Sequence, residues 1–230
     1  MTTKPTPRLV IFDCDGVLID SEGPSCRLIA RDVRGRGGDL DDERALDFAG
    51  MSLTEIRERL NGSGTIALPD DWVAKIQEQL VELMGQEARA IDGAEAMVAA
   101  VIAMGLPVRV GSNSSMAEMA AKFERVRFAG ALDGRTHSAR DMGAPKPAPN
   151  VFLHAARQEQ VPPDACVVLE DSDTGLAAAH AAGMTCVLLR AAAEPVPVWA
   201  KTWPDLHRIT HPDAFAPLLH RLCAQRRQAA

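Results

Sequence analysis

Residues 9–16 read LVIFDCDG, and this stretch gives the strongest signal in the chain. Four apolar, strand-forming residues lead directly into Asp13, Asp15 and Gly16, which predicts a buried strand followed by a tight turn. Because side chains alternate along a strand, both carboxylates would leave it on the same face. Ligands of α/β proteins bind at the carboxyl ends of strands, so the pair could act as nucleophile and acid–base, hold a divalent metal, or do both. A plain polar turn is the alternative, since Asp and Gly are common turn residues.

The composition limits the class of protein. The chain has 230 residues, 47% of them hydrophobic, and a formal net charge of −6. No basic cluster precedes the last residues, so we expect no nucleic-acid partner. The five cysteines are scattered without a Cys-x-x-Cys pair, which argues against zinc or a disulfide framework. Because no apolar run is long enough to span a membrane and the first residues lack a signal-peptide pattern, we expect a cytoplasmic protein with no membrane partner. Oligomeric state cannot be inferred from the sequence.

Short apolar runs alternate with alanine-rich helical stretches over most of the chain. This alternation predicts an α/β fold with a parallel sheet and helices on both of its faces. The further predicted strands are residues 107–111, 166–169, 185–189 and, more weakly, 206–210, and the predicted helices are residues 93–104, 115–126, 148–159 and 174–182.

Residues 21–89 interrupt this alternation. They contain helix-like stretches at 24–34, 42–49, 53–61 and 70–87, separated by glycine-rich breaks, and no convincing strand. A helical insertion directly after the first strand would lie above the strand ends, over Asp13 and Asp15. We therefore expect a lid whose closure excludes water from the site.

Polar residues also follow the other predicted strands. Ser112 and Asn113 follow the second strand and would suit an anionic oxygen, although a plain serine N-cap is the alternative. Glu170 and Asp171 follow the third strand. Lys146 lies between two prolines, which restrict the backbone around it.

If these strand ends meet, four carboxylates share one cavity. Two like charges about 5 Å apart repel by roughly 3 kcal/mol at an effective dielectric near 20, so such a group requires a cation. Magnesium prefers oxygen ligands and fits better than a soft transition metal. The candidate metal ligands are Asp13, Asp15, Glu170 and Asp171.

These motifs, in this order, resemble those of the haloacid dehalogenase superfamily, and the insertion is similar to its C1-type cap. The resemblance covers roughly residues 8–190 and rests on FDCDGV at 12–17, Ser112, the Lys-Pro-Ala-Pro motif at 146–149 and Glu170-Asp171-Ser172. It implies a Rossmann-like three-layer core with a parallel sheet, formed by residues 1–18 and 90–230. Residues 19–89 would form the α-helical cap domain.

The resemblance also implies phosphoryl transfer through an aspartyl-phosphate. Asp13 would be the nucleophile, and Asp15 would protonate the leaving alcohol and later accept a proton from water. Phosphoryl oxygens would be held by Ser112, Asn113 and Lys146, and Mg²⁺ by Asp13, the main-chain carbonyl of Asp15 and Asp171, with Glu170 close by. An ordinary Asp is ionised at pH 7, so Asp15 would need a raised pKa, which we expect from lid closure and the neighbouring negative charges.

The first expected function is a magnesium-dependent phosphatase, a phosphoric monoester hydrolase. Its partner would be a small phosphorylated metabolite such as a sugar phosphate, phosphogluconate or phosphoglycolate. The alternative is a sugar-phosphate mutase similar to β-phosphoglucomutase, but those relatives carry a histidine and a cap arginine where this chain has Ser25 and Leu53. Asp15 argues against the dehalogenases, which lack the second Asp. A non-catalytic binding protein on the same fold is the third interpretation.

Overall fold

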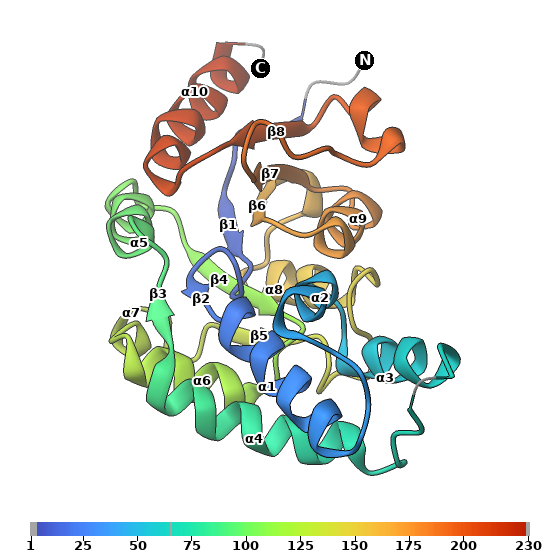
Figure 1. Ribbon diagram of the computed structural model, residues 1–230. Helices are drawn as coiled ribbons and strands as arrows, with labels where there is room; N and C mark the ends of the chain where they lie inside the picture. Colours follow the sequence, from blue (N-terminus) through green and yellow to red (C-terminus); the bar gives the residue numbers. More distant parts are fainter. Residues whose placement is uncertain (1–3, 65, 229–230) are drawn as a thin grey trace.

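A six-stranded parallel sheet forms the centre of the molecule (Figure 1). The structure is a computed structural model that describes residues 4–64 and 66–228. The strands follow one another across the sheet in the order β5 (Thr136–Ser138), β4 (Val108–Ser112), β1 (Leu9–Phe12), β6 (Cys166–Glu170), β7 (Thr185–Leu189) and β8 (Leu206–Ile209). β1 therefore lies between β4 and β6, and these three strands end side by side.

Side-chain alternation along β1 explains why helices cover both faces of the sheet. Val10 and Phe12 belong to one hydrophobic cluster, and Leu9 and Ile11 belong to another. The first cluster is completed by α5 (Ala94–Ala103), α6 (Met116–Arg125), α7 (Ala129–Leu132) and α10 (Phe215–Gln228), and the second by α8 (Asn150–Gln158) and α9 (Asp173–Ala181). The predicted α/β fold with a Rossmann-like three-layer core is confirmed.

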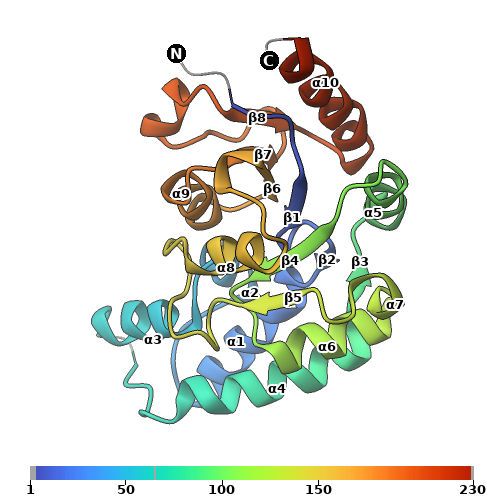
Figure 2. The same cartoon turned by 180° about the vertical axis from the view of Figure 1, so that it is seen from behind.

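The insertion after the first strand is helical and has a hydrophobic cluster of its own. It contains α1 (Glu22–Gly35), α2 (Asp42–Ala45), the 3-10 turn η1 (Leu46–Phe48), α3 (Leu53–Gly62) and α4 (Trp72–Glu87). Its cluster is built around the fully buried Trp72 and Ile76 of α4. Chain entry and exit lie together, because β2 (Ile19–Asp20) pairs antiparallel with β3 (Arg89–Ala90). In the view from behind, α4 runs alongside α6 of the core (Figure 2).

Most predicted elements are present with their ends shifted by one or two residues. β5 was missed because Thr136-His137-Ser138 has no apolar run to indicate a strand. The remaining short helical turns are η2 (Pro163–Ala165), η3 (Val198–Thr202) and η4 (Pro212–Ala214). Among the described helices, none combines the length and the apolar character needed to cross a membrane.

Candidate active site

Asp13 lies at the carboxyl end of β1 and is almost completely buried, with 6% of its surface exposed. Its backbone N–H donates to the carbonyl of Leu169 at 2.9 Å, which continues the pairing of β1 with β6. The chain then turns at Gly16, whose φ of 73° favours glycine. A Cβ at Gly16 would also overlap the carboxylate of Asp171. The turn therefore requires glycine for both its conformation and its packing.

Lys146 supplies the positive charge beside Asp13. Its Nζ donates to Asp13 Oδ1 and, at 2.6 Å, to Glu170 Oε1. The side chain is buried, and its loop is held by a 2.8 Å hydrogen bond from the Lys146 N–H to Asn113 Oδ1. Burial alone would lower the pKa of Lys146, but the two carboxylates outweigh it and raise the pKa above its ordinary value. Lys146 is therefore a fixed cation at the site.

Glu170 is held from two directions. Oε1 pairs with Lys146, and Oε2 accepts hydrogen bonds of 2.9 Å from the backbone N–H groups of Asp171 and Ser172 and from the Ser172 hydroxyl. A Cβ at Gly175 would overlap this carboxylate, so α9 can approach it only with glycine at that position. Glu170 is thus rigidly placed at the end of β6.

Three carboxylates converge on one point of the site. Asp13, Glu170 and Asp171 each offer an oxygen, and these oxygens lie within 4.8 Å of one another. Burial, followed by repulsion from Glu170, raises the pKa of Asp171 well above its ordinary value. Burial is also the main cause that raises the pKa of Asp13 to about 7, with Lys146 opposing it and the other carboxylates adding to it. An all-oxygen, strongly negative donor set of this kind fits a hard divalent cation.

The side chain of Asp15 is oriented differently and is not part of this group of three. It accepts hydrogen bonds from Ser21, from Ser114 Oγ at 2.7 Å and from Lys122 Nζ at 2.6 Å, with Ser112 Oγ further away at 3.3 Å. Burial would raise its pKa, but Lys122 and these hydrogen bonds lower the pKa below its ordinary value. The expectation of a raised pKa is therefore wrong for this arrangement, because it did not include a buried lysine partner.

Lys122 links Asp15 to the cap. It is fully buried, and its Nζ lies 2.5 Å from Glu118 Oε1 as well as 2.6 Å from Asp15. Gln77 of α4 donates to Glu118 Oε2 at 2.8 Å and to Ser115 Oγ at 3.1 Å. Sequence reasoning missed Lys122 because Glu118 and Lys122 are four residues apart on a helix, a spacing typical of an exposed ion pair.

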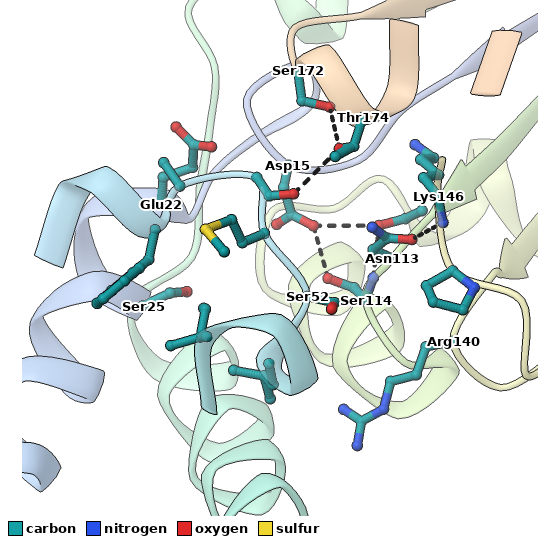
Figure 3. A pocket seen from close by; sticks show the side chains of 18 of the residues that line it. Asp15, Glu22, Ser25, Ser52, Asn113, Ser114, Arg140, Lys146, Ser172 and Thr174 are labelled. Atoms are coloured by element: carbon teal, nitrogen blue, oxygen red, sulfur yellow. Dashed lines mark hydrogen bonds between the residues drawn. The ribbon is translucent and has the colours of Figure 1, made fainter. Parts of the chain in front are cut away.

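A cavity of about 360 Å³ lies between the core and the insertion. We call its charged side the core floor: Asp13, Asp15, Ser112, Asn113, Ser114, Lys146, Glu170 and Asp171. We call the neutral residues opposite the cap wall: Ser25, Ile29, Phe48, Met51, Ser52, Leu53, Thr54 and Ile56. All seven residues predicted for the site line this cavity, several of them visible in Figure 3. Their catalytic roles remain predictions.

The sequence and the fold of this chain are similar to those of known proteins. The family model for haloacid dehalogenase-like hydrolases matches residues 7–183. The 6-phosphogluconate phosphatase of Escherichia coli is 29% identical over 177 residues, which cover 76% of this chain and 79% of that protein. A conserved haloacid dehalogenase-like protein from Agrobacterium tumefaciens has 29% identity and a TM-score of 0.75 over 94% of this chain and 99% of its own.

A further solved structure is a haloacid dehalogenase family hydrolase from Deinococcus radiodurans with bound phosphate and sodium. It has 29% identity and a TM-score of 0.71 over 93% of this chain and 96% of its own. The family model spans more than half of the chain and includes the core floor. The chain therefore belongs to the haloacid dehalogenase-like hydrolases.

Proposed function

We propose that this protein is a magnesium-dependent phosphatase that hydrolyses a small phosphorylated metabolite through an aspartyl-phosphate on Asp13. The observation that supports this most is the environment of Asp13, a buried carboxylate beside the fixed cation Lys146 that lines an open cavity. The E. coli relative, named as a 6-phosphogluconate phosphatase, supports the same reaction class. The substrate would be of the sugar phosphate, phosphogluconate or phosphoglycolate type.

The chain's own residues divide the reaction into two displacements. A carboxylate oxygen of Asp13 attacks phosphorus, the bond from phosphorus to the leaving oxygen breaks, and water later releases phosphate from Asp13. Lys146, Ser112 and Asn113 hold the phosphoryl oxygens and stabilise the charge that develops on them. A divalent cation at Asp13, Glu170 and Asp171 would add further charge neutralisation.

Asp15 is proposed to move the protons. It gives a proton to the leaving oxygen in the first displacement and takes one from water in the second. In this structure its carboxylate accepts hydrogen bonds from Lys122 and Ser114. Asp15 therefore has to lose some of these hydrogen bonds before its carboxyl group can contact the leaving oxygen. We propose that residues 19–89 act as a cap domain over a core of residues 1–18 and 90–230, and that the cap excludes water while this exchange occurs.

Phosphate release from a panel of substrates tests this function. The panel contains 6-phosphogluconate, glucose 6-phosphate, fructose 1-phosphate, phosphoglycolate and hexose 1-phosphates, each with Mg²⁺ or with EDTA. We expect release that requires Mg²⁺ and is lost in Asp13→Asn, with a circular dichroism spectrum unchanged from the wild type. Conversion of a hexose 1-phosphate to its 6-phosphate without phosphate release would instead show a mutase, despite Ser25.

A further inference from the structure

Arg140 lines the cavity beyond the catalytic groups. It follows β5 in a loop that is closely tied to the core floor, because the Ala139 N–H donates to the carbonyl of Ser112 at 2.8 Å. The same loop is held on its other side, since Asp141 Oδ2 accepts from the Met116 N–H at 2.8 Å. Hydrogen bonds of its two neighbours therefore hold the backbone of Arg140 in place against the core. In Figure 3 its side chain extends away from Lys146.

The guanidinium of Arg140 differs from the other cations near the site. Lys146 pairs with Asp13 and Glu170, and Lys122 pairs with Asp15 and Glu118. Among the residues that the structure describes, none forms a hydrogen bond or an ion pair with the Arg140 side chain, although it is partly buried. A guanidinium offers five donors in a planar fork that matches a carboxylate. Arg140 is thus a cation with unused donors at the edge of the cavity.

The cap wall places no charged side chain beside the Arg140 guanidinium. The cap wall consists of apolar and hydroxyl side chains. Glu118 is occupied by Lys122 and Gln77, and Glu22 lies on the side of the cavity away from Arg140 (Figure 3). An anionic group on the leaving part of a substrate would therefore find one cationic partner within the described lining, and that partner is Arg140.

We propose that Arg140 binds a carboxylate on the leaving group, so that the enzyme selects phosphorylated sugar acids or hydroxy acids over neutral sugar phosphates. This inference rests on the proposed phosphatase function and names its substrate class. A carboxylate is favoured over a second phosphate because one guanidinium balances one negative charge, and no second cation lies in the described lining beside it. The transferring phosphoryl group already has Lys146.

Two substrates that differ at one carbon test the proposal. 6-Phosphogluconate and glucose 6-phosphate both carry phosphate at carbon 6, but only the first has a carboxylate at carbon 1. We expect the wild type to favour 6-phosphogluconate in kcat/KM, and Arg140→Gln to reduce the ratio of the two kcat/KM values by about 10- to 100-fold, as for a lost charged hydrogen bond. Arg140→Lys should keep part of the ratio, because it retains the charge but not the fork. Arg157→Gln, at an exposed position of α8, should leave the ratio unchanged.

Binding to an inactive variant separates this inference from the proposed function. In the Asp13→Asn background, calorimetry should show that Arg140→Gln raises the Kd of 6-phosphogluconate by about 10- to 100-fold, and that of glucose 6-phosphate by much less. If binding discriminates in this way but the wild type releases no phosphate, the phosphatase function fails and the role of Arg140 stands. Equal effects on both ligands, or no effect on either, would overturn the role of Arg140.

Discussion

The core floor and the cap wall of the cavity differ in charge and in polarity. On the core floor nearly every side chain is charged or polar and has partners, as in the contacts of Lys146 with Asp13 and Glu170. The cap wall is mostly apolar and uncharged. In the proposed function, the core floor binds what all substrates share, the phosphoryl group. Arg140, beside the cap wall, is assigned the contact that distinguishes one leaving group from another.

The reason for the contrast is the cost of burying charge. An isolated ion that loses its hydration is strongly unfavourable, so the carboxylates of the core floor are held only together with lysines, hydroxyls or a cation. The cap wall avoids this cost by using apolar groups, several of which belong to the cluster around Trp72. Its surface can therefore vary in shape without disturbing the charged network.

The largest effect is expected when the core floor loses its fixed cation. Lys146→Met leaves Asp13 and Glu170 buried without their partner and should reduce the free energy of unfolding by about 3–5 kcal/mol in EDTA. Urea unfolding measures this change. Lys75→Met, which removes an exposed ion pair between Lys75 of α4 and Asp71 just before that helix, should change the free energy of unfolding little. Equal losses in the two variants would contradict the account of the core floor.

Metal removal tests the three converging carboxylates. Mg²⁺ at about 100 times its Kd should stabilise the folded protein by about 2.7 kcal/mol, seen as a higher Tm than in EDTA. Asp171→Asn should abolish this difference, since it removes one charged ligand. In EDTA the same variant should be as stable as the wild type or more so, because repulsion within the cluster is relieved. A full Mg²⁺ effect in Asp171→Asn would show that the cation binds elsewhere.

The pH dependence of stability in EDTA tests the burial of Asp13. Its pKa of about 7 in the folded protein exceeds the ordinary value of 3.8, so the folded state binds the additional proton between these values. The contribution of Asp13 to stability should therefore fall as pH rises from about 4 to 7, by at most about 1.4 kcal/mol for each pH unit, and the raised pKa of Asp171 adds a slope of the same sign. Asp13→Asn should make the measured slope less steep, and an unchanged slope would assign it to other groups such as Asp171.

The smallest effect is expected at the contact between core and cap. Gln77→Met removes two hydrogen bonds from α4, one to Glu118 of α6 and one to Ser115 at the N-terminal cap of α6, and should cost about 0.5–1.5 kcal/mol for each bond. Gln86→Met, on the exposed side of the same helix, is the matched control. We expect a higher KM in Gln77→Met but not in Gln86→Met, because only the first loses a contact that positions the cap against the core. Identical kinetics for both would mean that this contact has no part in placing the cap.

The fold and the charged half of the site could be predicted because they depend on local patterns. Apolar runs that end in acidic or hydroxyl residues identify the strand ends, and parallel strands bring these ends together. Lys122 could not be found in this way, since a lysine four residues after Glu118 has the pattern of a surface pair. Its burial depends on how α6 packs against α4, which no local pattern specifies. Arg140 was missed for a similar reason, because it follows β5, a strand without an apolar run.

The central claim is that Asp13 receives the phosphoryl group. Asp15→Asn should slow the release of phosphate from Asp13, and p-nitrophenyl phosphate needs little protonation of its leaving group, so the intermediate should accumulate. After acid quenching, mass spectrometry should find one additional phosphoryl group on the peptide that contains Asp13, and none when Asp13→Asn is also present. A phosphoryl group on another residue, or undiminished phosphate release by Asp13→Asn, would contradict the claim.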